Sequence, residues 1–139
     1  MNKWFLIFFL VVIDQFSKTL VLNYNYQASF NQGIAFGLLV SQWWLAINLI
    51  VVLLVLIILR KFYYPQALIV SGGIANILDR FLRGGVVDFI NISLIFRLIN
   101  LNFVFPDFNL ADIMICLGVI WLIFDLFYQE FKVNINKKH

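Results

Sequence analysis

The chain has 139 residues, of which 63% are hydrophobic and 12% are charged, and its formal net charge is +3. Soluble domains carry roughly 45–50% apolar and about 25% charged residues, so this composition excludes a water-soluble globular protein and predicts that lipid surrounds most of the chain. The positive charges stand at the ends of apolar runs and form no basic cluster, which argues for membrane topology and against nucleic acid as a partner.

The first predicted membrane span covers residues 4–22, which are apolar except around Asp14 to Lys18. Its start resembles the charged and apolar regions of a signal peptide, but Asp14 and Gln15 stand where small residues would mark a cleavage site. We therefore expect a mature helix. The polar stretch 24–37 that follows is typical of an exposed loop or short strands.

Two further spans are predicted in the middle of the chain. Residues 38–59 carry no charge and are long enough to cross a hydrocarbon core of about 30 Å, and Arg60 and Lys61 follow them. The third span, residues 65–82, has polar side chains near its far end and is followed by the helix-breaking pair Gly84 and Gly85.

The irregular stretch 86–105 predicts strand or interfacial structure, and residues 109–128 predict the last span. Cys116 lies inside that last apolar run and is interpreted as a buried structural cysteine. The predicted fold is thus an all-α integral membrane domain, residues 1–139, with four transmembrane helices and a small extracytoplasmic β or irregular element. Lysine and arginine are in excess on the side of both termini, which places the termini in the cytoplasm.

Polar residues of three predicted spans gather at one depth. An ionised group inside a span costs about 2.5–3.5 kcal/mol on insertion scales, so each one calls for a reason. The spacings i, i+3, i+4 and i+7 put such residues on one face of each helix. The residues concerned, with one that follows the glycine pair, are Asp14, Lys18, Asn76, Asp79, Arg80, Arg83, Asp88, Asn109 and Asp112.

The carboxylates in this cluster suggest hydrolysis by an aspartate pair. Two carboxylates held close together cannot both ionise comfortably, so one keeps a proton while the other acts as a base. Such a pair activates water without a metal, and we expect no metal and no cofactor. A Ser-Lys site is disfavoured because Ser17 and Lys18 point about 100° apart on a helix. The only histidine, His139, is the last residue, which argues against sites that need a held imidazole.

Five stretches of the chain resemble the sequence blocks of bacterial lipoprotein signal peptidases, also called prolipoprotein or type II signal peptidases. They occur in the family's order and extend from the first predicted span to the last. The stretches are residues 14–18 (DQFSK), 31–37 (NQGIAFG), 72–80 (GGIANILDR), 85–89 (GVVDF) and 106–112 (PDFNLAD).

The resemblance implies an aspartic endopeptidase of the bacterial cytoplasmic membrane. Members of the family cut a prolipoprotein before a cysteine that already carries diacylglycerol, so the implied partners are that precursor and membrane lipids. The family's catalytic aspartates correspond to Asp88 and Asp112, at the outer membrane face.

Roles for the supporting residues are hypotheses at this stage. Those expected to orient the substrate backbone and the catalytic carboxylates are Asn76, Asn109 and Arg80. Those expected to brace the helices are Asp14, Lys18 and Asp79, and Asn31 is expected to contact substrate from the outward loop.

Two other functions remain open from the residues alone. A small transporter or proton conductor would need polar groups at successive depths, whereas this chain has them mainly at one face, and the second span offers only Gln42 and Asn48. A Mg²⁺-dependent lipid transferase would need a tight cluster of aspartates with basic residues for a diphosphate, and here Asp79 and Asp88 are separated by the glycine pair.

Overall fold

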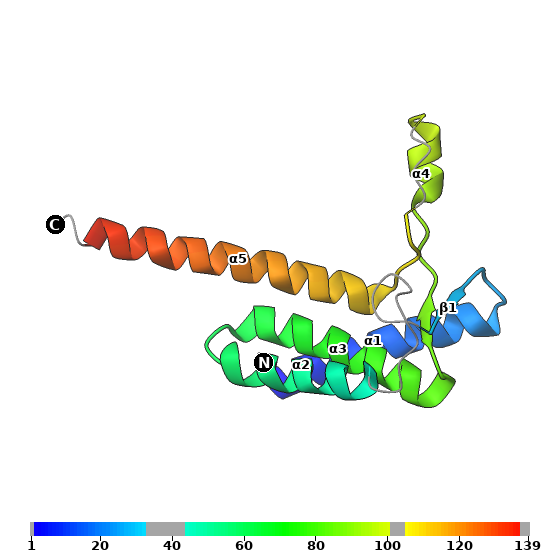
Figure 1. Ribbon diagram of the computed structural model, residues 1–139, viewed down its shortest axis with the longest axis horizontal. Helices are drawn as coiled ribbons and strands as arrows, with labels where there is room; N and C mark the ends of the chain where they lie inside the picture. The colour runs from blue at the N-terminus through cyan, green and yellow to red at the C-terminus, as the bar shows by residue number, and fades with distance from the viewer. Residues whose placement is uncertain (1, 33–43, 101–104, 137–139) are drawn as a thin grey trace.

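The computed structural model describes residues 2–32, 44–100 and 105–136 and is predominantly helical (Figure 1). This described part of the chain forms five helices and two short strands. They are α1 (Lys3–Asn23), β1 (Ser29–Asn31), α2 (Trp44–Ile58), α3 (Tyr63–Arg83), β2 (Val86–Asp88), α4 (Ser93–Leu98) and α5 (Leu110–Asn136).

Helix α3 is the centre of the helical body, because α1, α2 and α5 all pack against it. Small residues allow α3 and α5 to approach each other closely. A Cβ added at Gly72 would overlap the Ala111 carbonyl oxygen of α5, and one at Gly118 would lie 3.0 Å from the Pro65 carbonyl oxygen of α3. The side of α3 that carries Asn76 is thereby held close to the start of α5.

The ends of α3 follow from its sequence. Pro65 is accommodated because the first turn of a helix needs no backbone N–H from it. At the other end Gly84 adopts a left-handed conformation, with φ of 75°, and its N–H bonds the Arg80 carbonyl oxygen. Glycine takes this conformation without steric cost, so the helix ends here and the chain turns directly into β2.

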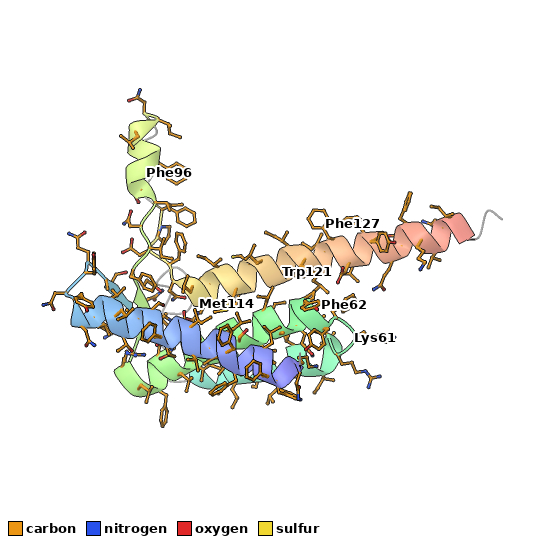
Figure 2. The ribbon with its side chains drawn as sticks, turned by 180° about the vertical axis from the view of Figure 1, so that it is seen from behind. Lys61, Phe62, Phe96, Met114, Trp121 and Phe127 are labelled. Carbon is orange, nitrogen blue, oxygen red and sulfur yellow. The ribbon has the colours of Figure 1, made fainter. Side chains whose placement is uncertain are left out.

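Two helices within the described residues, α1 and α5, have the length and hydropathy of membrane spans. Their surfaces are rich in exposed apolar side chains, among them Phe8 at 67% and Phe127 at 68% exposure. Figure 2 shows Phe127 on the outside of α5. Such surfaces fit lipid and would be unfavourable in water.

A polar contact at the end of the body opposite to β2 joins three helices. Gln66 of α3 is fully buried, and its amide donates to the carbonyl oxygens of Val55 (3.1 Å) and Leu56 (2.8 Å) near the end of α2. Its own oxygen accepts a hydrogen bond of 2.5 Å from Lys3 Nζ at the start of α1. The Gln66 amide thus caps the backbone carbonyl oxygens near the end of α2, and the Val55 carbonyl also accepts from the Leu59 N–H.

The two strands form a small antiparallel sheet in which Ser29 pairs with Asp88 and Asn31 pairs with Val86. Beyond β2, a bridge between Ile90 and Phe108 brings the chain back to the start of α5. The described residues of the intervening segment, 91–100 and 105–107, carry α4 away from the helical body (Figure 1). These described residues are called the arm below.

The arm is tied at its base by side chains as well as by the bridge. Asn91 Nδ2 donates to Asp107 Oδ1 at 2.5 Å, and the Ser93 hydroxyl lies 3.2 Å from both the backbone nitrogen and the carbonyl oxygen of Phe105. The rings of Phe96 and Phe105 stack with their centroids 6.4 Å apart. Residues 91–93 and 105–107, the two ends of the arm, are therefore held together where the arm leaves the helical body.

Several predicted boundaries change in the structure. The third helix begins at Tyr63 rather than at 65, because proline is tolerated in its first turn. The last helix ends at Asn136 rather than at 128, so residues 129–136 are also helical. Residues 33–43, with Gln42, lie outside the described residues, and they include part of the predicted second span.

One interpretation of local environment is wrong, and one is incomplete. Cys116 is exposed on the surface of α5, although Met114, two residues earlier on the same helix, is buried. The interpretation of 86–105 as strand or interfacial structure missed α4, a helix of six residues that has no amphipathic repeat long enough to be recognised. The predicted strand at its beginning is confirmed as β2.

Candidate active site

The start of α5 is a reciprocal capping arrangement that fixes Asp112. The side-chain oxygen of Asn109 accepts from the Asp112 N–H at 3.1 Å, and Asp112 Oδ2 accepts from the Asn109 N–H at 3.2 Å. This is the capping-box pattern, with asparagine at the N-cap and aspartate at the third helical position. Asp112 therefore lies in the first turn, where the helix dipole favours negative charge.

Two buried amides connect Asp112 to Asp88. Asn109 Nδ2 donates to Asp88 Oδ1 at 2.6 Å and to Asn76 Oδ1 at 3.3 Å. Asn76 Nδ2 in turn donates to Asp112 Oδ1 at 2.9 Å. Residues from β2, α3 and the start of α5 thus form one hydrogen-bonded network that holds both carboxylates in place.

Asp88 is the last residue of β2 and is only 3% exposed. Burial raises its pKa from 3.8 to about 6, because the charged form loses its hydration. Hydrogen bonds from Asn109 and Asn31 act against this rise, the charge of Asp112 adds to it, and the charge of Lys18 opposes it. Asp88 therefore keeps its proton to a higher pH than an ordinary aspartate.

Replacing Asp88 by asparagine is expected to stabilise the protein above pH 6. Folding raises the pKa of Asp88, so the stability that this residue contributes is present below about pH 4 and is lost as the pH rises through about 6. Asparagine does not titrate, so Asp88→Asn should gain roughly 1–2 kcal/mol at pH 7 and nothing at pH 4. Thermal unfolding of detergent-purified protein from pH 4 to 8 measures this difference, with Asp125→Asn as the control. A lower melting temperature for Asp88→Asn at pH 7 would contradict the expectation.

Beside the two carboxylates lies an ionic cluster that is completely buried. Lys18 Nζ of α1 makes 2.7 Å ion pairs with Asp14 Oδ2 and with Asp79 Oδ2, and the side chains of all three are 0% exposed. The same nitrogen is 3.3 Å from Asn76 Oδ1. The ammonium group therefore joins α1 to α3 and contacts the amide network of Asp88 and Asp112.

Asp79 accepts further hydrogen bonds from two residues that had no predicted role. Arg83 Nη1 lies 2.5 Å from Asp79 Oδ1, and Gln15 Nε2 lies 2.9 Å from the same oxygen. Arg83 also donates to Gln15 Oε1 at 2.8 Å. The sequence contained a signal for both: Gln15 lies within the first motif, and Arg83 lies on the polar face of the third span.

Most of the predicted site residues come together in the structure. Residues distributed over nearly a hundred positions of the chain are joined by hydrogen bonds and ion pairs, and Asn31 of β1 reaches Asp88. Arg80 lies on α3 beside this network, where its Nη1 is 3.4 Å from the Asn76 carbonyl oxygen, and it lies within electrostatic range of Asp88 and Asp112. Gln66 is a further buried polar residue that was not predicted, and it lies at the other end of the body.

Within residues 2–32, 44–100 and 105–136, no three His, Cys, Asp or Glu side chains gather closely enough to hold a metal ion. The carboxylates of the site are separated by Lys18 and the asparagines and form no common set of oxygen ligands. The expectation of a metal-free site stays a prediction.

Known proteins resemble this chain over most of its length. Residues 6–128 match the family model described as signal peptidase (SPase) II. The lipoprotein signal peptidase of Halalkalibacterium halodurans is 34% identical over 151 residues, which cover 92% of this chain and 93% of the relative. The lipoprotein signal peptidase of Rickettsia prowazekii is 35% identical over 158 residues, which cover 93% of this chain and 77% of the relative.

Solved structures agree with the sequence relatives. A bacterial membrane enzyme determined at 2.3 Å resolution superposes with a TM-score of 0.71 at 25% identity, covering 92% of this chain and 88% of its own. A second, determined at 1.9 Å resolution, has a TM-score of 0.67 at 26% identity, covering 89% of this chain and 91% of its own. The extent of the family match and the identity to its members lead to one conclusion: this chain is a bacterial membrane protein that belongs to the signal peptidase II family.

Proposed function

We propose that Asp88 and Asp112 form an aspartic dyad that hydrolyses the signal peptide bond of prolipoproteins. The chain belongs to a peptidase family whose members are named lipoprotein signal peptidases, and removal of signal peptides from prolipoproteins is the function that follows. The observation that supports the dyad best is the chain of amides, Asn109 and Asn76, that links the two carboxylates. The transporter and lipid-transferase functions are not favoured by this family membership.

In the proposed reaction the two aspartates have different roles. Asp112 accepts two N–H donors, one from the Asn109 backbone and one from the Asn76 amide, which suits an ionised base. Asp88 is more buried and has the raised pKa, which suits the protonated partner. Asp112 takes a proton from the attacking water while Asp88 donates its proton to the scissile carbonyl oxygen, which gives a tetrahedral intermediate with two hydroxyls. Asp112 then gives its proton to the leaving nitrogen while Asp88 takes one back from a hydroxyl of the intermediate. The C–N bond breaks, the amine of the new N-terminus leaves, a carboxylic acid remains on the signal peptide, and both aspartates return to their starting states.

The charge of the cluster supports one shared proton. Among the described residues, three cations face four carboxylates, so full ionisation would leave a net charge of −1, and a single proton makes the cluster neutral. A buried cluster is least costly when it is neutral. The cations are Lys18, Arg80 and Arg83, and the carboxylates are Asp14, Asp79, Asp88 and Asp112.

The proposed setting is one membrane domain with four spans, α1, α2, α3 and α5, and both termini in the cytoplasm. Support comes from the 15 residues described for α2, of which only Asn48 is polar, and from the 21 residues of α3, which measure about 31 Å along a helix. The polar side chains Asn76 and Asp79 of α3 are buried against neighbouring helices and need not contact lipid. In this topology the dyad opens toward the outer face.

The proposed substrate is a precursor whose cysteine carries diacylglycerol. The acyl chains hold that cysteine at the membrane, where the sheet of β1 and β2 with the arm is the material available to bind an extended peptide. Backbone polar groups of such a peptide need partners when they enter lipid. Asn31 lies on β1 next to Asp88, which supports its proposed role near the substrate.

Cleavage of a purified lipidated precursor by the purified enzyme, followed by gel mobility, tests this function. We expect cleavage of the diacylglyceryl form, little or none of the unmodified precursor, and the same rate with and without a metal chelator. Equal cleavage of both precursors would contradict the lipid requirement. Loss of cleavage on chelation would contradict the metal-free dyad.

A further inference from the structure

We propose that Asp14, Gln15, Lys18 and Asp79 act together as a spacer that sets the distance between the two dyad carboxylates. These residues are positioning residues, since they contact the backbone beside the dyad and each other rather than the reacting atoms. The inference rests on the proposed function of Asp88 and Asp112 as the dyad. It assigns to the ionic cluster a role beyond bracing the helices.

One end of the spacer holds the residue before Asp112. Asp14 Oδ1 accepts a 2.8 Å hydrogen bond from the backbone N–H of Ala111, which is fully buried at the second position of α5. This N–H belongs to the first turn, so it has no partner within the helix. Asp14 of α1 thereby fixes the position of the turn that carries Asp112.

The other end holds the residue before Asp88 in the same manner. Asp79 Oδ2 accepts a 3.1 Å hydrogen bond from the backbone N–H of Val87, which is fully buried in β2. The two spacer carboxylates thus make equivalent contacts, each with the peptide N–H of the residue that immediately precedes one dyad aspartate in the chain.

Two side chains connect these ends. Lys18 Nζ is 2.7 Å from an oxygen of each spacer carboxylate. Gln15 Nε2 also reaches both, at 3.3 Å to Asp14 Oδ2 and 2.9 Å to Asp79 Oδ1, and it donates to the Ala75 carbonyl oxygen at 3.1 Å. The four side chains close a ring, so the distance between Asp14 and Asp79 is fixed by two independent connections.

The distance set by this ring matters because it controls how the dyad shares its proton. Repulsion between two nearby carboxylates separates their two apparent titration steps, and the singly protonated form exists between them. The charged groups that face Asp88 are Asp112 of α5, Lys18 of α1 and Arg80 of α3. A looser ring would weaken the repulsion and narrow the pH range of the active form.

The test uses Gln15→Leu, which removes the amide contacts with Asp14, Asp79 and the Ala75 carbonyl oxygen, together with the hydrogen bond from Arg83, and keeps every formal charge. We expect kcat for the lipidated precursor to fall about 10-fold, KM to change less than about twofold, and the bell-shaped pH profile of kcat to narrow by about one pH unit. Asp14→Asn is the second variant, because it turns an amide NH₂ toward the Lys18 ammonium, and we expect the same narrowing. Thr19→Val on the same helix is the control, since the Thr19 hydroxyl donates to the Gln15 carbonyl oxygen of its own helix and should leave kcat and the profile unchanged when removed.

A purely structural role would lower kcat by reducing the fraction of folded enzyme and would leave the width of the pH profile unchanged. That result for both variants would overturn the proposal. An infrared titration of the protonated dyad carboxyl, assigned by its loss in Asp88→Asn, gives a readout that needs no substrate. A shift of this titration in Gln15→Leu supports the spacer even where the wild type fails to cleave the precursor, a failure that would refute the proposed function alone. An unchanged titration overturns the spacer.

Discussion

Asp88→Asn and Asp112→Asn are each expected to lower the rate of precursor cleavage by at least about 10³-fold. Asparagine keeps the size of the side chain and can accept the same amide hydrogen bonds, but it cannot take a proton from water or share one. General acid–base catalysis contributes about 10² to 10⁴ in rate, and residues that act as one unit lose nearly everything together. The double variant should therefore be little slower than either single variant.

The measurement is single-turnover cleavage of the diacylglyceryl precursor by equal amounts of folded enzyme. Asp125→Asn is the matched control, because this aspartate lies on the same helix as Asp112 but 13 residues further, about 20 Å away. Both dyad variants should fold. The oxygen of an asparagine side chain at position 112 can still accept from the Asn109 N–H, and one at position 88 can still accept from the Asn109 amide. Cleavage at the wild-type rate by either variant would remove that residue from the dyad.

Lys18→Met is expected to give the largest loss of stability among single substitutions in the site. The change leaves Asp14 and Asp79 buried without their shared cation, although Arg83 remains on Asp79. Removing one partner of a buried ion pair typically costs about 3–5 kcal/mol, because the remaining charge is neither hydrated nor paired. Methionine fills nearly the same volume, so lost packing should contribute little.

Thermal unfolding in detergent detects this loss, with Lys61→Met as the control for removal of an exposed lysine. The double variant Lys18→Met with Asp14→Asn should recover part of the stability, since it removes the buried charge of Asp14, which has lost its cation. A melting temperature for Lys18→Met equal to that of the wild type would show that the ammonium contributes little to stability. A double variant less stable than Lys18→Met would contradict the electrostatic explanation.

The gathering of the polar residues could be predicted from the sequence because helical spacing is a local property. Asn76 and Asp79 are three residues apart, as are Asn109 and Asp112, so each pair had to share a helix face. Composition and charge distribution placed these faces at one depth. The ion pair of Asp14 with Lys18, four residues apart, followed from the same geometry and is confirmed.

Contacts between distant segments could not be derived from spacing. The hydrogen bond from Ala111 to Asp14 joins residues 97 positions apart. The hydrogen bond from Val87 to Asp79 uses a backbone N–H, which nearly every residue has, so the residue type does not indicate it. Gln66 was missed because its partners are backbone carbonyls of α2, which any sequence would offer, and the distant Lys3. The end of α5 was placed too early because the prediction followed the apolar run, whereas the more polar residues 129–136 continue the same helix.

The bridge between Ile90 and Phe108 makes the structure of the arm independent of the positions of Asp88 and Asp112. The arm leaves and re-enters the helical body at this bridge. Its length and composition can therefore change without moving β2 or the start of α5. Lengthening a closed loop costs only about 0.6 kcal/mol for each doubling of its length. The length of the arm is therefore expected to vary at little energetic cost while the positions of Asp88 and Asp112 stay the same.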